Sequence, residues 1–350
     1  GIEAYQAMIT AEVYQAKSAT GARDHLHLYQ NDHESPVIQM TVAKVEDCPG
    51  AVKKYRLSAA DGAELPRWTA GAHLDIVVAP EFLRQYSMCG DPADLSCYEI
   101  AVLQEPEGRG GSQLMHRIFE LGRRVFVSKP INHFELEPSA KLSLLFGGGI
   151  GVTPMLAFAH ELHRKGGRFR LMYSASQKSK AAFDGAFDGL AWADRVSRHY
   201  SDQGTRLDIA RDVPAYDAGT HIYVCGPDAY MSAILDHARS IGYPEAALHA
   251  EFFTVPELPE WENHPFEIER ANGQKIPVTA TQSASDALIA AGIPVDVKCA
   301  DGLCGVCKCT VLSGEVEHRD FVLSAAQRET TVILCQSRAA EAGGVLKLDI

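Results

Sequence analysis

Four cysteines near the C-terminus have a spacing that suits an iron–sulfur cluster. Cys299, Cys304 and Cys307 lie in the segment CADGLCGVC, and Cys335 ends the run VILC. A C-x4-C-x2-C pattern with a distant fourth cysteine is the plant-type 2Fe–2S spacing. We expect a tight loop to supply three thiolates and a returning strand to supply the fourth, so these four cysteines are predicted metal ligands.

A structural zinc site is the alternative interpretation. Such sites usually pair two short C-x2-C knuckles, and this segment contains one. Cys309 follows Cys307 by two residues on an expected strand, and we expect a packed thiol there rather than a fifth ligand. The chain has nine cysteines, an odd number with one tight cluster, which argues against a disulfide framework. The pattern favours a reducing, cytoplasmic location.

The segment RQYS (84–87) combines side chains that suit a phosphate and an aromatic ring. Arg84 offers a fork to a phosphate, Tyr86 offers a ring face and a hydroxyl, and the Ser87 hydroxyl can reach a ring nitrogen such as flavin N5. Downstream, GRGGS (108–112) can form a nest of N–H donors for the same phosphate. An isolated arginine on a strand is more often a solvated surface residue, but the two motifs in this order favour a flavin site.

Two glycine-containing turns suit a nicotinamide dinucleotide. GGGIGVTPM (147–155) lies at a strand-to-helix turn, where N–H groups favour a pyrophosphate. Because it is not the full G-x-G-x-x-G fingerprint, a close-packing turn is the alternative. Cys225 begins a Cys-Gly-Pro turn at the end of another strand, which places both turns on one edge of a parallel sheet. Cys225 is either a packed core thiol or faces the nicotinamide.

The elements that must position these residues fall into three predicted domains. Over 37–138, short alternating runs such as KKYRLSAA, HLDIVVA and YEIAVLQ predict an antiparallel β-barrel. Over 139–255, strands LSLLFGG, FRLMYSAS and THIYVC alternate with helical patterns and predict an α/β parallel sheet. A Pro-rich acidic linker spans 256–265. In 266–350, Asn272-Gly273 predicts a hairpin and Ser283 a helix cap.

Composition excludes two classes of partner. The formal net charge of -12 argues against nucleic acid, and no apolar run approaches the roughly 18 residues of a membrane helix. The first residues, GIEAYQAMIT, lack the features of a secretory signal. Residues 1–36 form an N-terminal extension to which the sequence assigns no role.

Taken in order, RQYS, GRGGS, GGGIGVTPM, CGP and C-x4-C-x2-C…C resemble the phthalate dioxygenase reductase family, including vanillate O-demethylase reductase subunits. The resemblance covers about residues 38–350. It implies an FMN-binding barrel, an NADH-binding domain and a β-grasp 2Fe–2S ferredoxin domain. It also implies a separate terminal oxygenase of the Rieske type as the electron acceptor.

The resemblance also implies roles for individual residues. Carried over by motif, the FMN contacts are Arg84, Gln85, Tyr86, Ser87, Ala101, Leu103, Gly110, Gly111 and Ser112. The NADH contacts are Gly148, Gly149, Thr153, Pro154, Ser174, Cys225, Gly226 and Pro227. Ser87, Cys225 and Phe253 take catalytic roles, with Phe253 of HAEFF covering the flavin. Phe252 is the alternative for that role, and both phenylalanines otherwise pack a domain interface.

The function that follows is electron transfer from NADH through FMN and the cluster to an oxygenase that hydroxylates or demethylates an aromatic compound or a small amine. A P450 or oxygen as the acceptor, and a redox sensor, are alternatives. FAD in place of FMN stays open. Ser176 and Lys178 follow the second α/β strand without an arginine to hold a 2′-phosphate, which favours NADH over NADPH.

Overall fold

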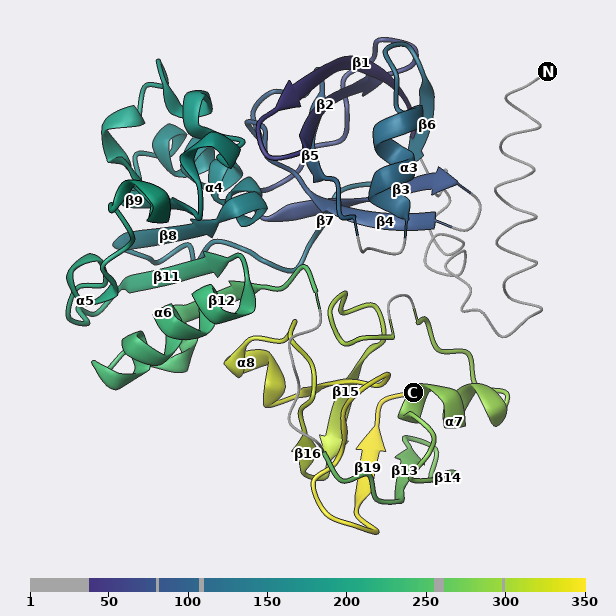
Figure 1. Ribbon diagram of the computed structural model, residues 1–350. Coiled ribbons are helices and arrows are strands. Elements are labelled where there is room, and N and C mark those ends of the chain that lie inside the picture. The colour runs from purple at the N-terminus through teal and green to yellow at the C-terminus, as the bar shows by residue number, and fades with distance from the viewer. Residues whose placement is uncertain (1–37, 80–81, 107–109, 255–260, 298–299) are drawn as a thin grey trace. The chain divides into compact units, whose positions relative to one another are not determined.

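The computed structural model describes residues 38–79, 82–106, 110–254, 261–297 and 300–350 (Figure 1). These residues form two compact units, of which the first ends at Glu251 and the second begins at Phe252. The N-terminal extension, and with it residues 255–260 of the linker region, lies outside the described residues. No helix in the described part is long and apolar enough to cross a membrane.

The first half of the first unit is the predicted antiparallel sheet. Its strands pair in the order β4-β3-β6-β1-β2-β5, with β7 on β3. An isolated bridge between Met88 and Ile100 joins the two edges, so the sheet closes on itself as a barrel. The elements are β1 (Ile38–Cys48), β2 (Val52–Ala59), β3 (Ala72–Ala79), β4 (Phe82–Ser87), β5 (Tyr98–Leu103), α3 (Gly111–Ile118), β6 (Arg124–Val127) and β7 (Ile131–Asn132).

The second half of this unit is a parallel sheet in the order β10-β9-β8-β11-β12. The chain runs outward from β8 in one direction and then returns to its other side with β11. The carboxyl ends of β8 and β11 therefore meet at a topological switch point, where such sheets bind ligands. The elements are β8 (Leu142–Gly148), η1 (Gly149–Gly151), α4 (Val152–Arg164), β9 (Phe169–Ala175), η2 (Lys178–Lys180), η3 (Asp184–Phe187), η4 (Ala193–Arg195), β10 (Val196–Tyr200), η5 (Ser201–Gln203), α5 (Ile209–Asp212), β11 (Thr220–Cys225), α6 (Asp228–Ser240), η6 (Glu245–Ala247) and β12 (Leu248–Glu251).

Sequence reasoning found three of these five parallel strands and missed β10 and β12. The sequences of the two missed strands, VSRHY and LHAE, are short and carry polar side chains. Both strands lie at the edges of the sheet, where one side of the strand is unpaired. An edge strand needs no continuous apolar run, which is why the pattern did not reveal them.

One continuous hydrophobic core joins the barrel to the parallel-sheet half. The rings of Phe134, Phe158 and Tyr223 contact one another within it, with centroids 5.1–6.0 Å apart. The Ala70 N–H also donates to the buried Glu161 carboxylate on α4, at 2.9 Å. This shared core explains why the two halves form a single compact unit.

The C-terminal unit is built on a mixed sheet in the order β14-β13-β19-β15-β17. The predicted hairpin at Asn272-Gly273 is confirmed, because β13 and β14 pair antiparallel around it. The predicted cap is also confirmed, since the Ser283 hydroxyl accepts from the Asp286 N–H at the start of α7. The elements are β13 (Phe266–Arg270), β14 (Lys275–Val278), α7 (Ala284–Ala290), β15 (Lys308–Ser313), β16 (Val316–Glu317), α8 (Ala325–Arg328), β17 (Thr331–Ile333), β18 (Arg338–Ala339) and β19 (Val345–Leu348). The predicted fold class, with an antiparallel, a parallel and a ferredoxin-type domain in this order along the chain, is thereby confirmed.

Candidate functional site

Three of the four predicted cluster cysteines lie in the described part of the C-terminal unit, and all three are buried. Cys304 and Cys307 occupy the loop before β15, and Cys335 lies in the turn after β17. The Leu334 N–H donates to the Cys307 carbonyl at 3.1 Å, so the loop and the returning strand meet next to Cys335. Cys299 lies outside the described residues, and among the residues that are described no group of three metal-binding side chains has the geometry of a metal site.

The backbone of the cysteine loop is held in an unusual conformation. Ala300 has φ +62°, a left-handed conformation that costs a residue with a Cβ about 1–2 kcal/mol. The Gln336 side chain donates to the Ala300 carbonyl at 2.6 Å and the Phe321 N–H to the Gly302 carbonyl at 3.1 Å. A Cβ on Gly302 would lie 3.2 Å from Asp320 Cα, so the loop packs closely on that segment. This tight loop carries cysteines and is held in place by hydrogen bonds from Gln336 and Phe321, which suits a cluster held by thiolates.

Cys309 lies on β15, and its thiol contacts backbone carbonyl groups. Its thiol lies 3.8 Å from the Asp349 carbonyl and 3.7 Å from that of Thr310. Burial, and then the nearby Asp349 charge, raise the pKa of the Cys309 thiol, which keeps it protonated. These contacts suit a packed thiol.

Arg84 and the α3 N-terminus come together at the predicted flavin phosphate site. Gly110 caps α3 with φ 82°, a left-handed conformation that favours glycine. A Cβ on Gly111 would collide with the Arg84 guanidinium, which therefore lies directly against this helix end. A guanidinium beside free helix N–H groups is a site for a phosphate. The Ser112 hydroxyl accepts from the Glu105 N–H at 3.1 Å and keeps its own proton for a ligand.

The other predicted flavin residues lie on β4 and β5. Tyr86 is half-buried, and burial raises the pKa of its hydroxyl to about 12, so it stays a neutral donor. Gln85 points to the opposite side of β4 and contacts the His73 ring. Ala101 and Leu103 lie on the face of β5 opposite to Ile100 and Val102. Ala101 is buried in the hydrophobic core as well, and Leu103 is half-buried.

Gly111→Ala should weaken flavin binding about 10- to 100-fold, because the new methyl group displaces Arg84 from the phosphate site. The change is measured by titrating flavin-free protein with FMN and following fluorescence. Gly185→Ala is the matched control, because a Cβ there would meet nothing within 4 Å. Unchanged affinity in Gly111→Ala would show that the phosphate binds elsewhere.

The turn after β8 forms the second part of the site. Gly147 and Gly148 end the strand, and a Cβ on Gly147 would lie 2.6 Å from Val152 Cα at the start of α4. Thr153 is buried, and its hydroxyl donates to the Ile150 carbonyl at 2.9 Å, which fixes the turn. Pro154 is also buried in the first helical turn, and Gly149 faces open space. The free N–H groups of α4 and this open turn suit a pyrophosphate.

Cys225, Glu251 and Ser87 form a cluster beside that turn. Cys225 and Glu251 are register partners at the carboxyl ends of β11 and β12. The Ser87 hydroxyl, from the barrel, donates to Glu251 Oε2 at 2.9 Å. Burial raises the pKa of Glu251 to about 7, and the Ser87 hydrogen bond partly offsets the rise. Burial, and then Glu251, raise the pKa of Cys225 well above its usual value, so its thiol is protonated.

Sequence reasoning did not identify Glu251, although it stands in the quoted segment HAEFF. Strand β12 was missed, so nothing indicated that this glutamate ends a strand of the parallel sheet. The available signal was its position directly before Phe252, after a short run that pairs with the strand of Cys225. The structure brings Glu251 together with two predicted site residues from different halves of the unit.

Phe252 and Phe253 belong to the C-terminal unit. The Phe252 ring contacts Phe321, with centroids 5.2 Å apart, whereas Phe253 is 41% exposed. The exposed ring is available for a contact outside its own unit. Its assignment as the residue that covers the flavin stays a prediction.

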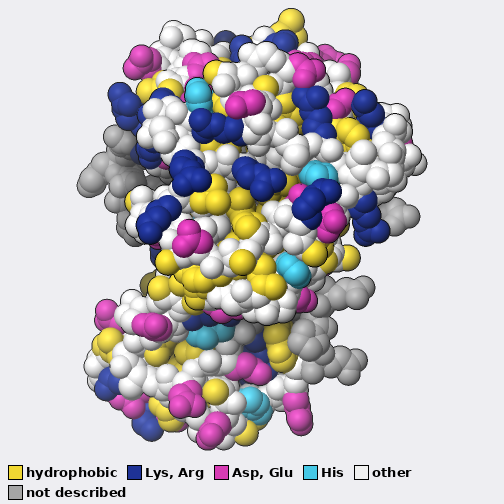
Figure 2. Space-filling model, turned by 90° about the vertical axis from the view of Figure 1, so that its left-hand side faces the viewer, with side chains coloured by type: hydrophobic (Ala, Val, Ile, Leu, Met, Phe, Trp, Pro, Cys, Tyr) yellow, Lys and Arg dark blue, Asp and Glu magenta, His cyan; other side chains and the backbone are white. Residues whose placement is uncertain are grey.

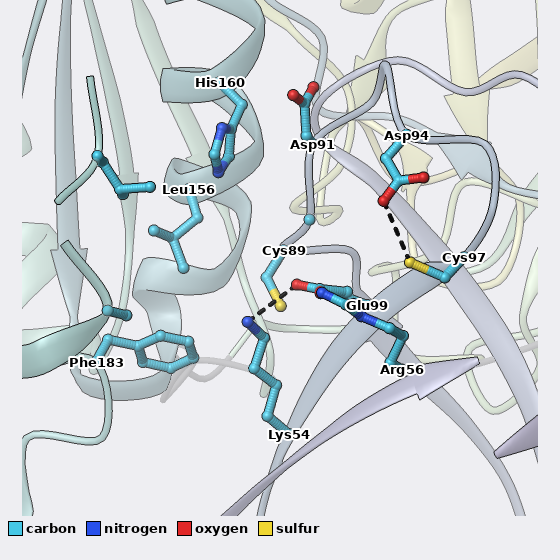
Figure 3. A pocket seen from close by; sticks show the side chains of 13 residues that line it. Lys54, Arg56, Cys89, Asp91, Asp94, Cys97, Glu99, Leu156, His160 and Phe183 are labelled. Carbon is cyan, nitrogen blue, oxygen red and sulfur yellow. Dashed lines mark hydrogen bonds and ion pairs between the residues drawn. The ribbon is translucent and has the colours of Figure 1, made fainter. Parts of the chain in front are cut away.

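A cavity of about 250 Å³ lies between the barrel and the parallel-sheet half (Figure 3). Glu99 accepts from Lys54 at 2.9 Å and also pairs with Arg56 on its polar wall, while His160 and Phe183 lie on the opposite wall. Burial raises the pKa of Cys89 in this cavity to about 12. Ser87, Cys225 and Glu251 are not among its lining residues, so this interface cavity is separate from the cluster described above.

The chain is similar to several known proteins. Residues 268–340 match the model of the 2Fe-2S iron-sulfur cluster binding domain. The chain is 40% identical over 295 residues to a vanillate O-demethylase oxidoreductase from Pseudomonas sp. (strain HR199 / DSM 7063), covering 83% of this chain and 93% of that protein. It is 34% identical over 314 residues to the phthalate 4,5-dioxygenase oxygenase reductase subunit of Pseudomonas putida, covering 88% and 95%.

Two solved structures are also similar. Phthalate dioxygenase reductase matches with a TM-score of 0.63 and 33% identity, covering 90% of this chain and 98% of that one. A type IV self-sufficient cytochrome P450 monooxygenase matches with a TM-score of 0.81 and 32% identity, covering 93% of this chain. This chain spans 43% of that longer protein.

The fold and site define an electron-transfer reductase that takes electrons from a nicotinamide nucleotide and passes them through a flavin to a 2Fe–2S cluster. The chain belongs to the family of phthalate dioxygenase reductase and vanillate O-demethylase reductase. The resemblance seen in the sequence motifs is thereby confirmed, and so is the reductase function.

Proposed function

We propose that this reductase uses NADH and FMN and delivers single electrons to a separate Rieske-type oxygenase or demethylase. The main support for the nucleotide chemistry is the cluster of Ser87, Glu251 and Cys225 at the switch point of the parallel sheet. The Ser87 hydroxyl donates to Glu251 at 2.9 Å, and Glu251 is the register partner of Cys225. A bound flavin supplies the ability to take two electrons as a hydride and release them one at a time. In this proposal residues 37–138 bind FMN, residues 139–255 bind NADH and residues 266–350 bind the cluster.

The residues of this chain have distinct parts in the proposal. Arg84 and the α3 N-terminus hold the FMN phosphate. Ser87 donates its proton to Glu251 and offers its hydroxyl oxygen to the flavin ring as an acceptor. Protonated Cys225 and the turn at Gly148 orient the nicotinamide. Cys299, Cys304, Cys307 and Cys335 hold the cluster. The cysteines in the described part of the chain are free thiols, which suits a reducing compartment, and we propose a cytoplasmic location.

The phosphate site supports FMN rather than FAD as the flavin. The Arg84 guanidinium packs against Gly111 at the N-terminus of α3. This arrangement suits a terminal phosphate ester. Flavin released by heating and identified by chromatography decides between the two. FMN supports the assignment and FAD contradicts it.

The preference for NADH over NADPH is assigned to Asp202. Its carboxylate accepts from the Lys178 N–H at 3.0 Å, and its own N–H donates to the Ser176 carbonyl at 3.1 Å. Asp202 thus lies beyond the carboxyl ends of β9 and β10. A carboxylate there accepts from a ribose 2′-hydroxyl and repels a 2′-phosphate.

Asp202→Ala should therefore lower the ratio of kcat/KM for NADH to that for NADPH by about tenfold. Steady-state rates with both nucleotides measure this ratio. Asp236→Asn, an exposed change on α6, serves as the control and should leave the ratio unchanged. A wild-type preference for NADPH, or an unaltered ratio in Asp202→Ala, would refute the role of Asp202.

The separate acceptor is proposed from the relatives and from surface charge. Relatives named as reductase components include that of carnitine monooxygenase from Escherichia coli, at 33% identity. On the face seen in Figure 2 acidic side chains outnumber basic ones over the C-terminal unit. The exposed acidic residues of this unit include Glu315, Glu329 and Glu341. Such a surface suits an acceptor with a basic docking patch.

The test is electron transfer from the NADH-reduced protein to purified acceptors, followed by stopped flow. We expect fast transfer to a Rieske-type oxygenase of the matching system, slowing as salt is added. The second candidate is a P450, favoured by the similarity to the self-sufficient P450 structure. Faster transfer to a P450 than to any Rieske-type oxygenase would overturn the proposed acceptor.

A further inference from the structure

Two hydroxyl groups at the nucleotide edge of the parallel sheet are buried without a hydrogen-bond partner among the described residues. They are Ser174 Oγ, at the end of β9, and the Tyr230 hydroxyl, in the first turn of α6. Buried polar groups are nearly always paired, so each exception needs an explanation. An unpaired buried hydroxyl destabilises the free protein, and the loss is recovered when a ligand supplies the missing partner.

Both hydroxyls lie next to the glycine turn. Ser174 is the register partner of Gly148. A Cβ on Gly148 would lie 2.9 Å from Tyr230 Cδ1 and 3.1 Å from Pro227 Cδ, so the Tyr230 ring packs against this glycine. The missing side chain of Gly147 points instead at Val152 of α4. Tyr230 therefore lies on the α6 side of the turn, opposite the α4 side.

The two hydroxyls are near each other. Burial raises the pKa of Tyr230, and a hydrogen-bond contact with the Ser174 hydroxyl partly offsets this rise. Neither group makes a hydrogen bond with good geometry to the other. Two hydroxyls that face one region without pairing can both bond to a polar group placed between them.

The position along the edge indicates which part of the nucleotide they meet. Cys225 and Glu251 lie on β11 and β12, on one side of β8, and the nicotinamide belongs there. Ser174 lies on β9, on the other side of β8. Asp202 follows the carboxyl end of β10, the next strand in the same direction. A dinucleotide whose pyrophosphate crosses at Gly148 places its adenosine half over β9.

We propose that Tyr230, together with Ser174, positions the adenosine half of the dinucleotide by hydrogen bonds to its ribose or to the adjoining phosphate. This inference rests on the proposed nicotinamide site and adds Tyr230, which no sequence motif indicated. Both residues are assigned to binding. Ser174 lies on β9, on the side of β8 away from β11 and β12, and the Tyr230 hydroxyl is close to Ser174.

The test compares Tyr230→Phe and Ser174→Ala with the wild-type holoenzyme. Each variant should raise KM for NADH and the inhibition constant of ADP about tenfold, because each loses a hydrogen bond to the adenosine half. The kcat at saturating NADH should stay within about twofold. ADP is the probe because it carries adenosine and two phosphates but no nicotinamide.

Tyr243→Phe is the matched control. Tyr243 is buried in the same half of the unit, and its hydroxyl donates to the Pro214 carbonyl at 3.0 Å. This variant should leave both constants unchanged. Flavin content and circular dichroism show whether each variant is folded, and the small change Ser174→Ala decides the outcome if Tyr230→Phe does not fold.

Unchanged inhibition by ADP in folded Tyr230→Phe overturns the role of Tyr230, and unchanged inhibition in Ser174→Ala does so for Ser174. A loss of kcat without a change in KM also overturns the proposal. Failure of the proposed function is a different result, since wild-type flavin would then stay oxidised when NADH is added.

Discussion

Replacing Cys304 with serine should lower NADH-dependent reduction of cytochrome c at least about 100-fold while leaving reduction of the flavin by NADH intact. The variant loses one of the four thiolates that we propose as cluster ligands, and a cluster with an incomplete ligand set is not retained. The first unit has its own hydrophobic core, so its cofactor sites persist. Visible absorbance of the purified variant should show flavin bands without cluster bands.

Cys309→Ser provides the control for this experiment. Its thiol already contacts the Asp349 and Thr310 carbonyls, so serine should keep the cluster and the cytochrome c rate. Ferricyanide, which accepts electrons from the flavin directly, should be reduced at the wild-type rate by both variants. Retention of the cluster in Cys304→Ser, or its loss in Cys309→Ser alone, would show that the ligands are assigned wrongly.

The rate of flavin reduction by NADH should fall about 10- to 30-fold between pH 6 and pH 8.5, and this dependence should vanish in Glu251→Gln. The pKa of Glu251 is about 7, so the carboxyl is mainly neutral below that pH and ionised above it. An ionised carboxylate at Ser87 opposes the arrival of a hydride in the same region, because like charges repel. Glutamine is neutral at every pH, so its profile should be flat and remain near the rate at low pH.

Single-turnover stopped flow under anaerobic conditions measures this rate without the later electron transfers. Glu120→Gln, an exposed change in the same unit, should keep the wild-type profile. Thermal stability gives an independent readout. Because burial raises the folded-state pKa of Glu251, wild-type stability falls as pH rises toward and through 7. Glu251→Gln should therefore raise Tm at pH 8.5 and have less effect at pH 5. An inflection near pH 7 that survives in Glu251→Gln would assign it to another group.

The sequence predicted those parts of the fold and site that are local in the chain. The cysteine spacing, the hairpin at Asn272-Gly273 and the cap at Ser283 each depend on a few neighbouring residues, and the hairpin and cap are confirmed. The apolar interior strand β8 was found from its continuous run. Features that depend only on neighbouring residues can be predicted from the order of the residues in the sequence.

Features that depend on distant pairing were not predictable in the same way. Strands β10 and β12 are polar edges, so only their pairing to β9 and β11 defines them. Glu251 becomes a site residue because Ser87, from the barrel, reaches it, and Tyr230 because Gly148 has no side chain. Nothing in the local sequence shows that Arg84 lies against Gly111. These contacts arise from tertiary packing, which periodicity does not report.

An anaerobic titration of the purified protein with NADH, followed by visible absorbance and electron paramagnetic resonance, tests the central claim most directly. The account expects flavin and cluster bands to be present and to bleach together, with about three electrons taken up per chain and the signal of a reduced 2Fe–2S centre at the end. Missing cluster bands in reconstituted protein, or a flavin that stays oxidised in excess NADH, would contradict it.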